Sequence, residues 1–105
     1  MKKQFVKFGT KFIDVDSIQS IEPAVDINEN GELNRAVVYI NASPYVRLAT
    51  ISLTEYMKAM MEDGKDDGLI FDEEALKDIM VMYIEEELIP HINGVGKLAN
   101  PITLE

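Results

Sequence analysis

The side chains best suited to acid–base catalysis are few in this chain. Its 105 residues include a single histidine, His91, and no cysteine, which excludes a thiolate nucleophile and a zinc site built on sulfur. His91 has no carboxylate close in sequence that could orient its ring. Asp14 and Asp16 could transfer protons if a cleft held them, but two acids at this spacing are more typical of a turn. We therefore predict a protein that is not an enzyme, with no catalytic residue and no cofactor.

A second pattern with chemical meaning is the acidic segment 63–74, DGKDDGLIFDEE. Aligned with the twelve-residue calcium loop of EF-hands, it places Asp63, Asp67 and Glu74 at the first, fifth and twelfth positions. Lys65 stands at the third position, where a hard cation needs oxygen, and the ninth position supplies no side-chain ligand. The alternative is an acidic glycine-containing turn between two helices. We predict no metal site, and a weak calcium-binding module is the least favoured function.

The net charge of −9 is concentrated in one part of the chain. Residues 62–87 carry eleven acidic side chains and two lysines, whereas the rest of the chain is balanced. This distribution argues against direct contact with nucleic acid or anionic lipid, because phosphate contacts require clustered Lys and Arg. It favours a protein partner with a basic surface. The alternative is that these acids only keep the protein solvated.

One predicted helix carries the carboxylates that we assign to partner binding. These residues are Asp72, Glu73, Glu74, Asp78, Glu85, Glu86 and Glu87. Acids are favourable near the start of a helix and unfavourable near its end, so the last three glutamates need some compensation. Contact with a basic partner would provide it, and a frayed, solvated helix end is the alternative.

The helix that must position these acids spans residues 72–89. Asp72 is its predicted N-cap, and Pro90 is expected to end it. One broad apolar face at helical spacing is expected to cover a sheet: Ala75, Leu76, Ile79, Met80, Tyr83 and Ile84. Val81 and Leu88 fall on the opposite side, so we expect this second surface to contact the C-terminal tail or a second copy in a homodimer.

Short aromatic and β-branched segments before residue 52 predict antiparallel strands. The expected strands cover 4–8, 11–15, the region around Val25 and Ile27, 35–41 and 46–51. Apolar side chains on both faces of 35–41 identify the central strand, and Pro23 restricts its own strand to a sheet edge. A further helix follows from Leu53, with Gly64 as its expected C-cap.

The expected architecture is α+β. It consists of an antiparallel β-meander of four to five strands, two α-helices packed on one face and an extended C-terminal tail that ends in a short strand near 102–104. The length predicts a single domain, residues 1–105. The longest apolar run has six residues, far fewer than the roughly 20 that a membrane span needs, and we expect a cytoplasmic protein.

These patterns together predict a non-enzymatic protein-binding module. The version that fits the charge best is an acidic inhibitor or accessory protein that engages a basic, nucleic-acid-binding partner. The alternative is a structural or assembly subunit that forms homo-oligomers through a sheet edge or an apolar helix surface.

Overall fold

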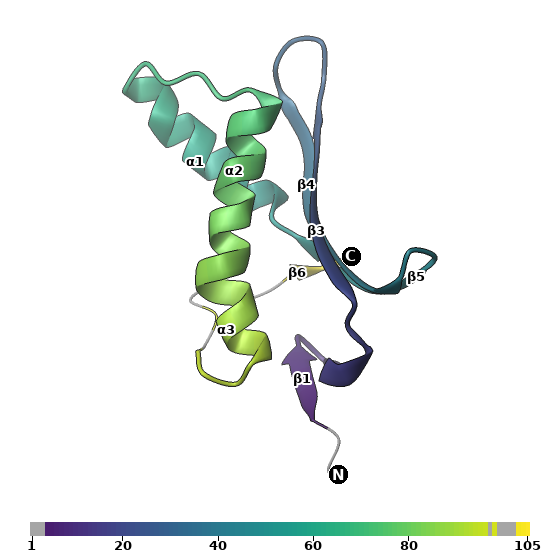
Figure 1. Ribbon diagram of the computed structural model, residues 1–105. Helices are drawn as coiled ribbons and strands as arrows, with labels where there is room; N and C mark the ends of the chain where they lie inside the picture. Colours follow the sequence, from purple (N-terminus) through teal and green to yellow (C-terminus); the bar gives the residue numbers. More distant parts are fainter. Residues whose placement is uncertain (1–3, 97, 99–102) are drawn as a thin grey trace.

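The computed structural model describes residues 4–96, 98 and 103–105 (Figure 1). Its elements are β1 (Phe5–Phe8), β2 (Lys11–Asp14), a 3₁₀ turn (Val15–Ser17), β3 (Ser20–Ile27), β4 (Leu33–Ser43), β5 (Val46–Ser52), α1 (Thr54–Asp66), α2 (Glu73–Tyr83), a π-helical turn (Ile84–Leu88), α3 (Ile89–Ile92) and β6 (Thr103–Leu104). Antiparallel strands come first and helices follow, so the predicted α+β class is confirmed. The expected extended tail falls largely on residues 97 and 99–102, outside the described residues.

The strands form two antiparallel sheets. β1 and β2 make a separate hairpin, and the larger sheet has the order β3-β4-β5-β6. β4 therefore has neighbours on both sides, as its apolar pattern predicts. β3 pairs only with β4, and Pro23 lies opposite Val38 in this pairing. Its place in an edge strand agrees with the restriction that proline imposes, because a proline has no N–H for a second neighbour.

One cluster of buried apolar side chains connects the hairpin, the larger sheet and the helices. Fully buried members come from all three parts and include Phe8, Val38, Ile40, Ile51, Met57, Leu76, Met80 and Leu88. The apolar face predicted for the second helix is thus confirmed, since Leu76, Met80 and Ile84 are buried in this cluster. In the described part of the chain, no helix has both the length and the apolar character needed to cross a membrane.

The helix that begins at Glu73 does not end at Pro90, and that prediction is wrong. α2, the π-helical turn and α3 follow one another without a break, and Ile92 is the last helical residue (Figure 1). A proline inside a regular α-helix would clash with the carbonyl four residues earlier. The wider π turn lies directly before Pro90, with the Ile89 N–H donating to Ile84 O, and it accommodates the proline ring.

The π turn also changes which side of the helix Leu88 occupies. In a regular α-helix, Leu88 would stand seven residues from Val81 on the same side. The extra residue in the π turn rotates the following segment, and Leu88 is completely buried in the core. Val81 is 39% exposed. Leu88 is therefore not accessible to a second copy, and the predicted contact of Val81 and Leu88 with the C-terminal tail falls largely outside the described residues.

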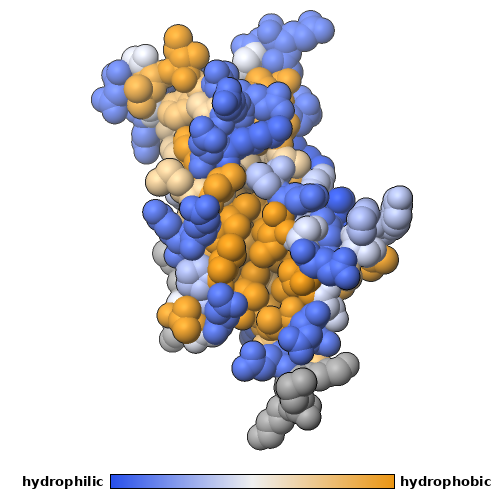
Figure 2. Space-filling model, in the orientation of Figure 1, coloured by the Kyte–Doolittle hydropathy of each residue, from blue (hydrophilic) through white to orange (hydrophobic). Residues whose placement is uncertain are grey.

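The molecule is long for its mass. Its principal extents are 52 × 28 × 21 Å, and its radius of gyration is 14.7 Å, against about 13 Å for a compact chain of this length. The accessible surface is 7110 Å², where a compact monomer of this mass exposes about 5,900 Å². Hydrophobic side chains also reach the surface along the seam between α2 and the free edge of β3 (Figure 2). The chain therefore exposes roughly 1,200 Å² more than a compact monomer needs to.

Candidate protein-binding loop

The predicted acidic residues lie along the helix in two groups. Asp72, Glu73 and Glu74 surround the start of α2, whereas Glu85 and Glu86 lie in the π turn, about 20 Å further along the axis at 1.5 Å per residue. Asp78 is exposed between the two groups. All of these side chains are exposed, so they are available to a partner, but one small contact cannot cover both groups.

Several of the acids already have interactions within the chain. The Asp72 carboxylate accepts a hydrogen bond from the Ala75 N–H at 2.8 Å, which confirms the predicted N-cap. Glu73 forms an exposed ion pair with Lys77 at 3.0 Å. Glu87 is half-buried and lies close enough to Tyr83 to help raise the pKa of that phenol. Glu87 therefore belongs to the side of the helix that packs on the protein.

The loop between α1 and α2, residues 67–72, begins with a glycine motif at Gly68 and not at the predicted Gly64. The Leu69 N–H donates to Gly64 O at 2.9 Å, and the Gly68 N–H donates to Lys65 O at 3.0 Å. Gly68 has a φ of 76°. This pair of bonds with a left-handed residue is the Schellman arrangement that terminates helices. The start of the loop is therefore held by backbone bonds in a defined shape.

Gly64 has a different role. It lies inside α1 and is buried, because the ring of Phe71 packs directly against it. Phe71 in turn packs against the main core. The loop is thus fixed at its start by the glycine motif, near its end by Phe71 and at the next residue by the Asp72 cap.

Two large aliphatic side chains project from this fixed loop. Leu69 is 56% exposed and Ile70 is 93% exposed. Full burial of one such side chain contributes about 1.5–3 kcal/mol of stabilising free energy. Leu69 and Ile70 do not gain this stabilisation in the isolated chain, because they remain exposed to water. This pair was not predicted, because the carboxylates around it are the stronger feature of the sequence. The sequence does contain a sign of their exposure. Leu69 and Ile70 belong to no helical or strand pattern, and they lie between a turn glycine, Gly68, and the N-cap Asp72.

The surroundings of Leu69 and Ile70 are strongly acidic. Asp66 and Asp67 precede them, the acids at the start of α2 follow, and all of these side chains are exposed. The β3–β4 turn, which carries the exposed Glu29 and Glu32, lies at the same end of the molecule (Figure 1). Hydrophobic side chains at this end stand among hydrophilic ones (Figure 2). We call this region, the loop 67–72 with its flanking acids, the acidic end.

The structure does not bring the aligned residues of the calcium-loop pattern, Asp63 and Glu74, into one loop. Asp63 lies within α1, and Glu74 lies in the first turn of α2 on the other side of the loop. Among the described residues, no three His, Cys, Asp or Glu side chains are grouped so that they could hold a metal ion. The Schellman motif explains why a glycine stands at the turn.

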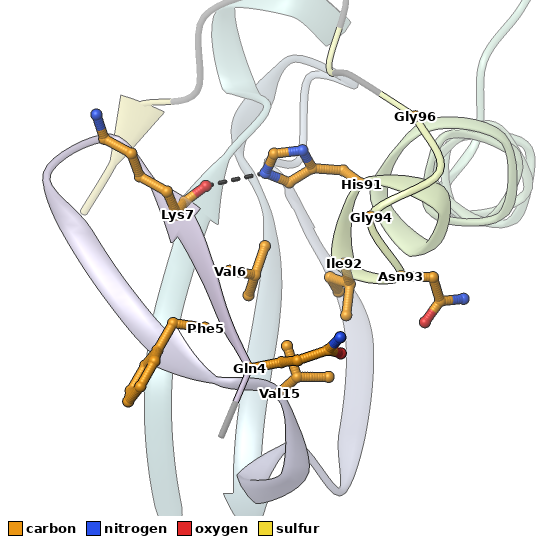
Figure 3. Close-up of a pocket in the computed structure, with 10 residues that line it drawn as sticks. All are labelled: Gln4, Phe5, Val6, Lys7, Val15, His91, Ile92, Asn93, Gly94 and Gly96. Atoms are coloured by element: carbon orange, nitrogen blue, oxygen red, sulfur yellow. Dashed lines mark hydrogen bonds between the residues drawn. The ribbon is translucent and has the colours of Figure 1, made fainter. Parts of the chain in front are cut away.

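The opposite end of the molecule contains a depression of about 360 Å³ between β1 and the end of α3 with the residues that follow it (Figure 3). It is lined by residues 4–7, by Val15, and by residues 91–94 and 96. The His91 Nε2 lies 2.9 Å from the Lys7 carbonyl oxygen, and its ring meets that of Phe8 edge to face at 5.5 Å. The lining includes Lys7 and His91 and no acidic residue. We call this hollow the His91 depression.

The outer face of the β1–β2 hairpin adjoins this depression. Phe5 and Phe12 are exposed on it, and the Lys7 ammonium lies 5.9 Å from the centre of the Phe12 ring. Phe5 also lines the depression. Asp14, which pairs with Phe5 across the hairpin, and Asp16 flank Val15 of the lining. This end of the molecule therefore combines apolar side chains with charges of both signs.

A polar network on the outer face of the larger sheet uses both arginines of the chain. The Arg47 guanidinium lies 3.4 Å from the centre of the Tyr39 ring, and its Nε donates to the buried Asn41 at 3.3 Å. Arg35 donates to the Tyr39 hydroxyl at 3.1 Å and pairs with Glu105. The hydrogen bond to Glu105 is the main reason that the pKa of Arg35 lies above its ordinary value. Both guanidinium groups are thus held by internal contacts.

Comparison of the chain with protein-family models, with curated proteins and with solved structures gives no match in any of the three.

Proposed function

We propose that this chain is a non-enzymatic protein-binding module, and that it engages a basic protein surface through Leu69 and Ile70. The observation that carries the proposal is the 93% exposure of Ile70 on a loop fixed at both ends and surrounded by carboxylates. A partner that buries Ile70 in an apolar pocket gains the free energy that the isolated chain leaves unused. Since the loop is already ordered, little conformational entropy is lost on binding.

The carboxylates around the loop give this contact its selectivity. Acids at the rim of an interface accelerate encounter with a positively charged partner and disfavour partners of like charge. The matching surface is an apolar pocket bordered by Lys and Arg, which is a composition that nucleic-acid-binding proteins offer.

A symmetric contact through the exposed face of α2 is less suitable. Leu88 does not contribute to that face, and Val81 stands among Glu74, Asp78 and Glu85. Two copies packed by this face would bring carboxylates of like charge together, which is unfavourable in an interface. This argument favours the loop over the helix as the binding element.

The proposal is tested with a photo-crosslinking residue in place of Ile70. Ile70→p-benzoylphenylalanine should capture specific proteins from an extract of the source cells, and the yield should fall steeply with added salt because exposed charges are screened. Tyr45→p-benzoylphenylalanine is the matched control, since Tyr45 is 95% exposed but lies on the β4–β5 turn. Equal products at both positions, or none at position 70, would rule out the loop as a binding element.

A further inference from the structure

The strand β1 has one edge that does not pair with β2. In an antiparallel hairpin, successive residues direct their N–H and C=O groups alternately toward the partner strand and away from it. The Val15 N–H donates to Gln4 O at 3.0 Å, so Gln4 and, two residues later, Val6 bond toward the β2 side. Phe5 and Lys7 therefore direct their backbone groups to the opposite edge, which we call the free edge of β1.

One backbone group on this free edge has a partner among the described residues. The His91 Nε2–H donates to the Lys7 carbonyl oxygen at 2.9 Å, since a carbonyl oxygen can only accept. The Phe5 N–H, the Phe5 carbonyl and the Lys7 N–H make no hydrogen bond within the described part of the chain. The Phe5 and Lys7 side chains point away from His91 (Figure 3). The free edge thus offers two donors and one acceptor in the spacing of an extended backbone.

The His91 depression lies along this free edge. Residues 4–7 form one wall of it, and residues 91–94 and 96 form the other. Its volume of about 360 Å³ is at the low end of the ~300–1,000 Å³ typical of ligand pockets, and it suits one or two side chains. Val6, Val15 and Ile92 give it an apolar lining (Figure 3). A strand added at the edge would direct alternate side chains to this side of the hairpin.

The two edges of the larger sheet are protected in a way that the free edge of β1 is not. Pro23 interrupts the edge of β3. The strand β6 covers the end of β5, and further along β5 the Leu48 carbonyl accepts a hydrogen bond from the Lys11 ammonium. Such devices prevent other strands from pairing with a sheet edge. At β1 the ring of His91 protects a single carbonyl, and Phe5 is left available for pairing.

We propose that the free edge of β1 binds an extended segment of a partner protein, which adds to the hairpin as a third strand. The segment exchanges hydrogen bonds with the Phe5 N–H and C=O and places an aliphatic side chain in the His91 depression. Charges of both signs lie at this end, including Lys7, Asp14 and Asp16. The backbone and the aliphatic side chain therefore select the segment, and its net charge does not. This site does not depend on the loop 67–72, so it goes beyond the proposed function.

A strand of a second copy fits this edge less well. The segment 91–96 faces β1 across the hollow, and the β1 edge of a second copy would bring its own such segment into the same space. The β3 edge of a second copy contains Pro23, and β6 already covers part of its β5 edge. A single extended segment with no sheet attached meets neither obstacle.

Random heptapeptides displayed on phage are the probe, and they are selected on the purified chain. Phe5→Pro serves for counter-selection, because it removes the N–H of the free edge without removing a hydrogen bond to β2. Selected peptides should bind Phe5→Pro roughly three- to tenfold more weakly, as expected for the loss of one hydrogen bond. Phe5→Ala keeps the N–H and is the matched control, which should bind more tightly than Phe5→Pro. Failure to obtain such peptides overturns the proposal.

Methylation of the peptide backbone tests the strand geometry without any change to the protein, and it carries the test if Phe5→Pro loses its native circular dichroism. A single N-methyl group is moved along a selected peptide. Binding should weaken at alternate positions only, because successive N–H groups of a strand point to opposite edges. Hydrogen exchange of the Phe5 N–H, measured by NMR, should slow in the complex. Equal losses at neighbouring positions, or unchanged exchange at Phe5, would exclude an added strand.

Two further measurements identify the source of the strand and separate the two proposals. Sedimentation of the purified chain should show no association that Phe5→Pro abolishes, since such association would assign the edge to a second copy and overturn the inference. Ile70→Asp should bind the selected peptides as the unmodified chain does. If position 70 crosslinks a partner while no peptide binds at β1, this inference fails and the proposed function stands. Peptide binding at β1 with no crosslink at position 70 gives the reverse result.

Discussion

The ring of Phe71 lies so close to Gly64 that a β-carbon on Gly64 would come within 2.5 Å of the Phe71 Cε2 atom. Gly64 is a residue of the α1 interior, where glycine is normally unfavourable by about 1 kcal/mol relative to alanine. Its presence there is explained by the ring, which reaches the helix backbone only because no side chain intervenes. This contact holds the end of the loop against α1.

Gly64→Ala should destabilise the protein by about 1 kcal/mol. The gain in helix propensity is about 1 kcal/mol, but displacement of the Phe71 ring forfeits part of the ~1.5–3 kcal/mol that its burial contributes. In a Phe71→Ala background the same substitution should stabilise, because the obstacle is gone. Urea denaturation of the four proteins in this double-mutant cycle gives the sign directly. The same sign in both backgrounds would contradict the proposed role of the contact.

Leu88→Ala should destabilise the protein by about 2–5 kcal/mol, since it leaves a cavity in the core. Val81→Ala, on the exposed side of α2, should change the free energy of unfolding by no more than about 0.5 kcal/mol. Chemical denaturation of the two variants compares them under the same conditions. Equal costs would mean that the two residues occupy equivalent positions, as in a regular α-helix without the π turn.

Tyr83 should make the protein less stable at alkaline pH. Burial raises its pKa from 10.0 to about 12, and the nearby Glu87 and Tyr56 add to the effect. Because the folded state holds this proton more tightly than the unfolded state does, the contribution is complete below pH 10 and is lost as the pH rises from 10 to 12. Free energies of unfolding measured across this range should fall less in Tyr83→Phe than in the unmodified chain. Parallel curves would show that Tyr83 titrates normally.

Local patterns in the sequence were sufficient for the strands and for the start of α2. The two apolar sides of β4 predict its central place, Pro23 predicts an edge, and Asp72 caps α2 as its spacing to the helix indicates. Each of these features depends on a residue and its immediate neighbours. They are therefore accessible to an argument from spacing and residue type.

The features that were not predicted have two causes. Some depend on contacts between residues far apart in the sequence, and others on a choice between two residues that suit the same role equally well. Gly64 and Gly68 are both acceptable helix ends by local preference, and the packing of Phe71 decides between them. The helix continues past Pro90 because of a π turn, which the spacing of apolar residues does not predict. The His91 depression joins residues 84 positions apart, so the sequence could not bring them together. The exposure of Ile70 likewise follows from the shape of the loop, which composition does not determine.

The position of Pro23 in β3 has a consequence for how copies of this chain can meet. A free sheet edge normally offers a row of donors and acceptors onto which another strand can add, which is the first step toward fibrous aggregates. Pro23, halfway along this edge, has no backbone N–H to donate, so a strand added at the edge would lack one hydrogen bond near its middle. Growth by continuous sheet extension is thereby discouraged, and contacts between molecules at this edge are left to side chains.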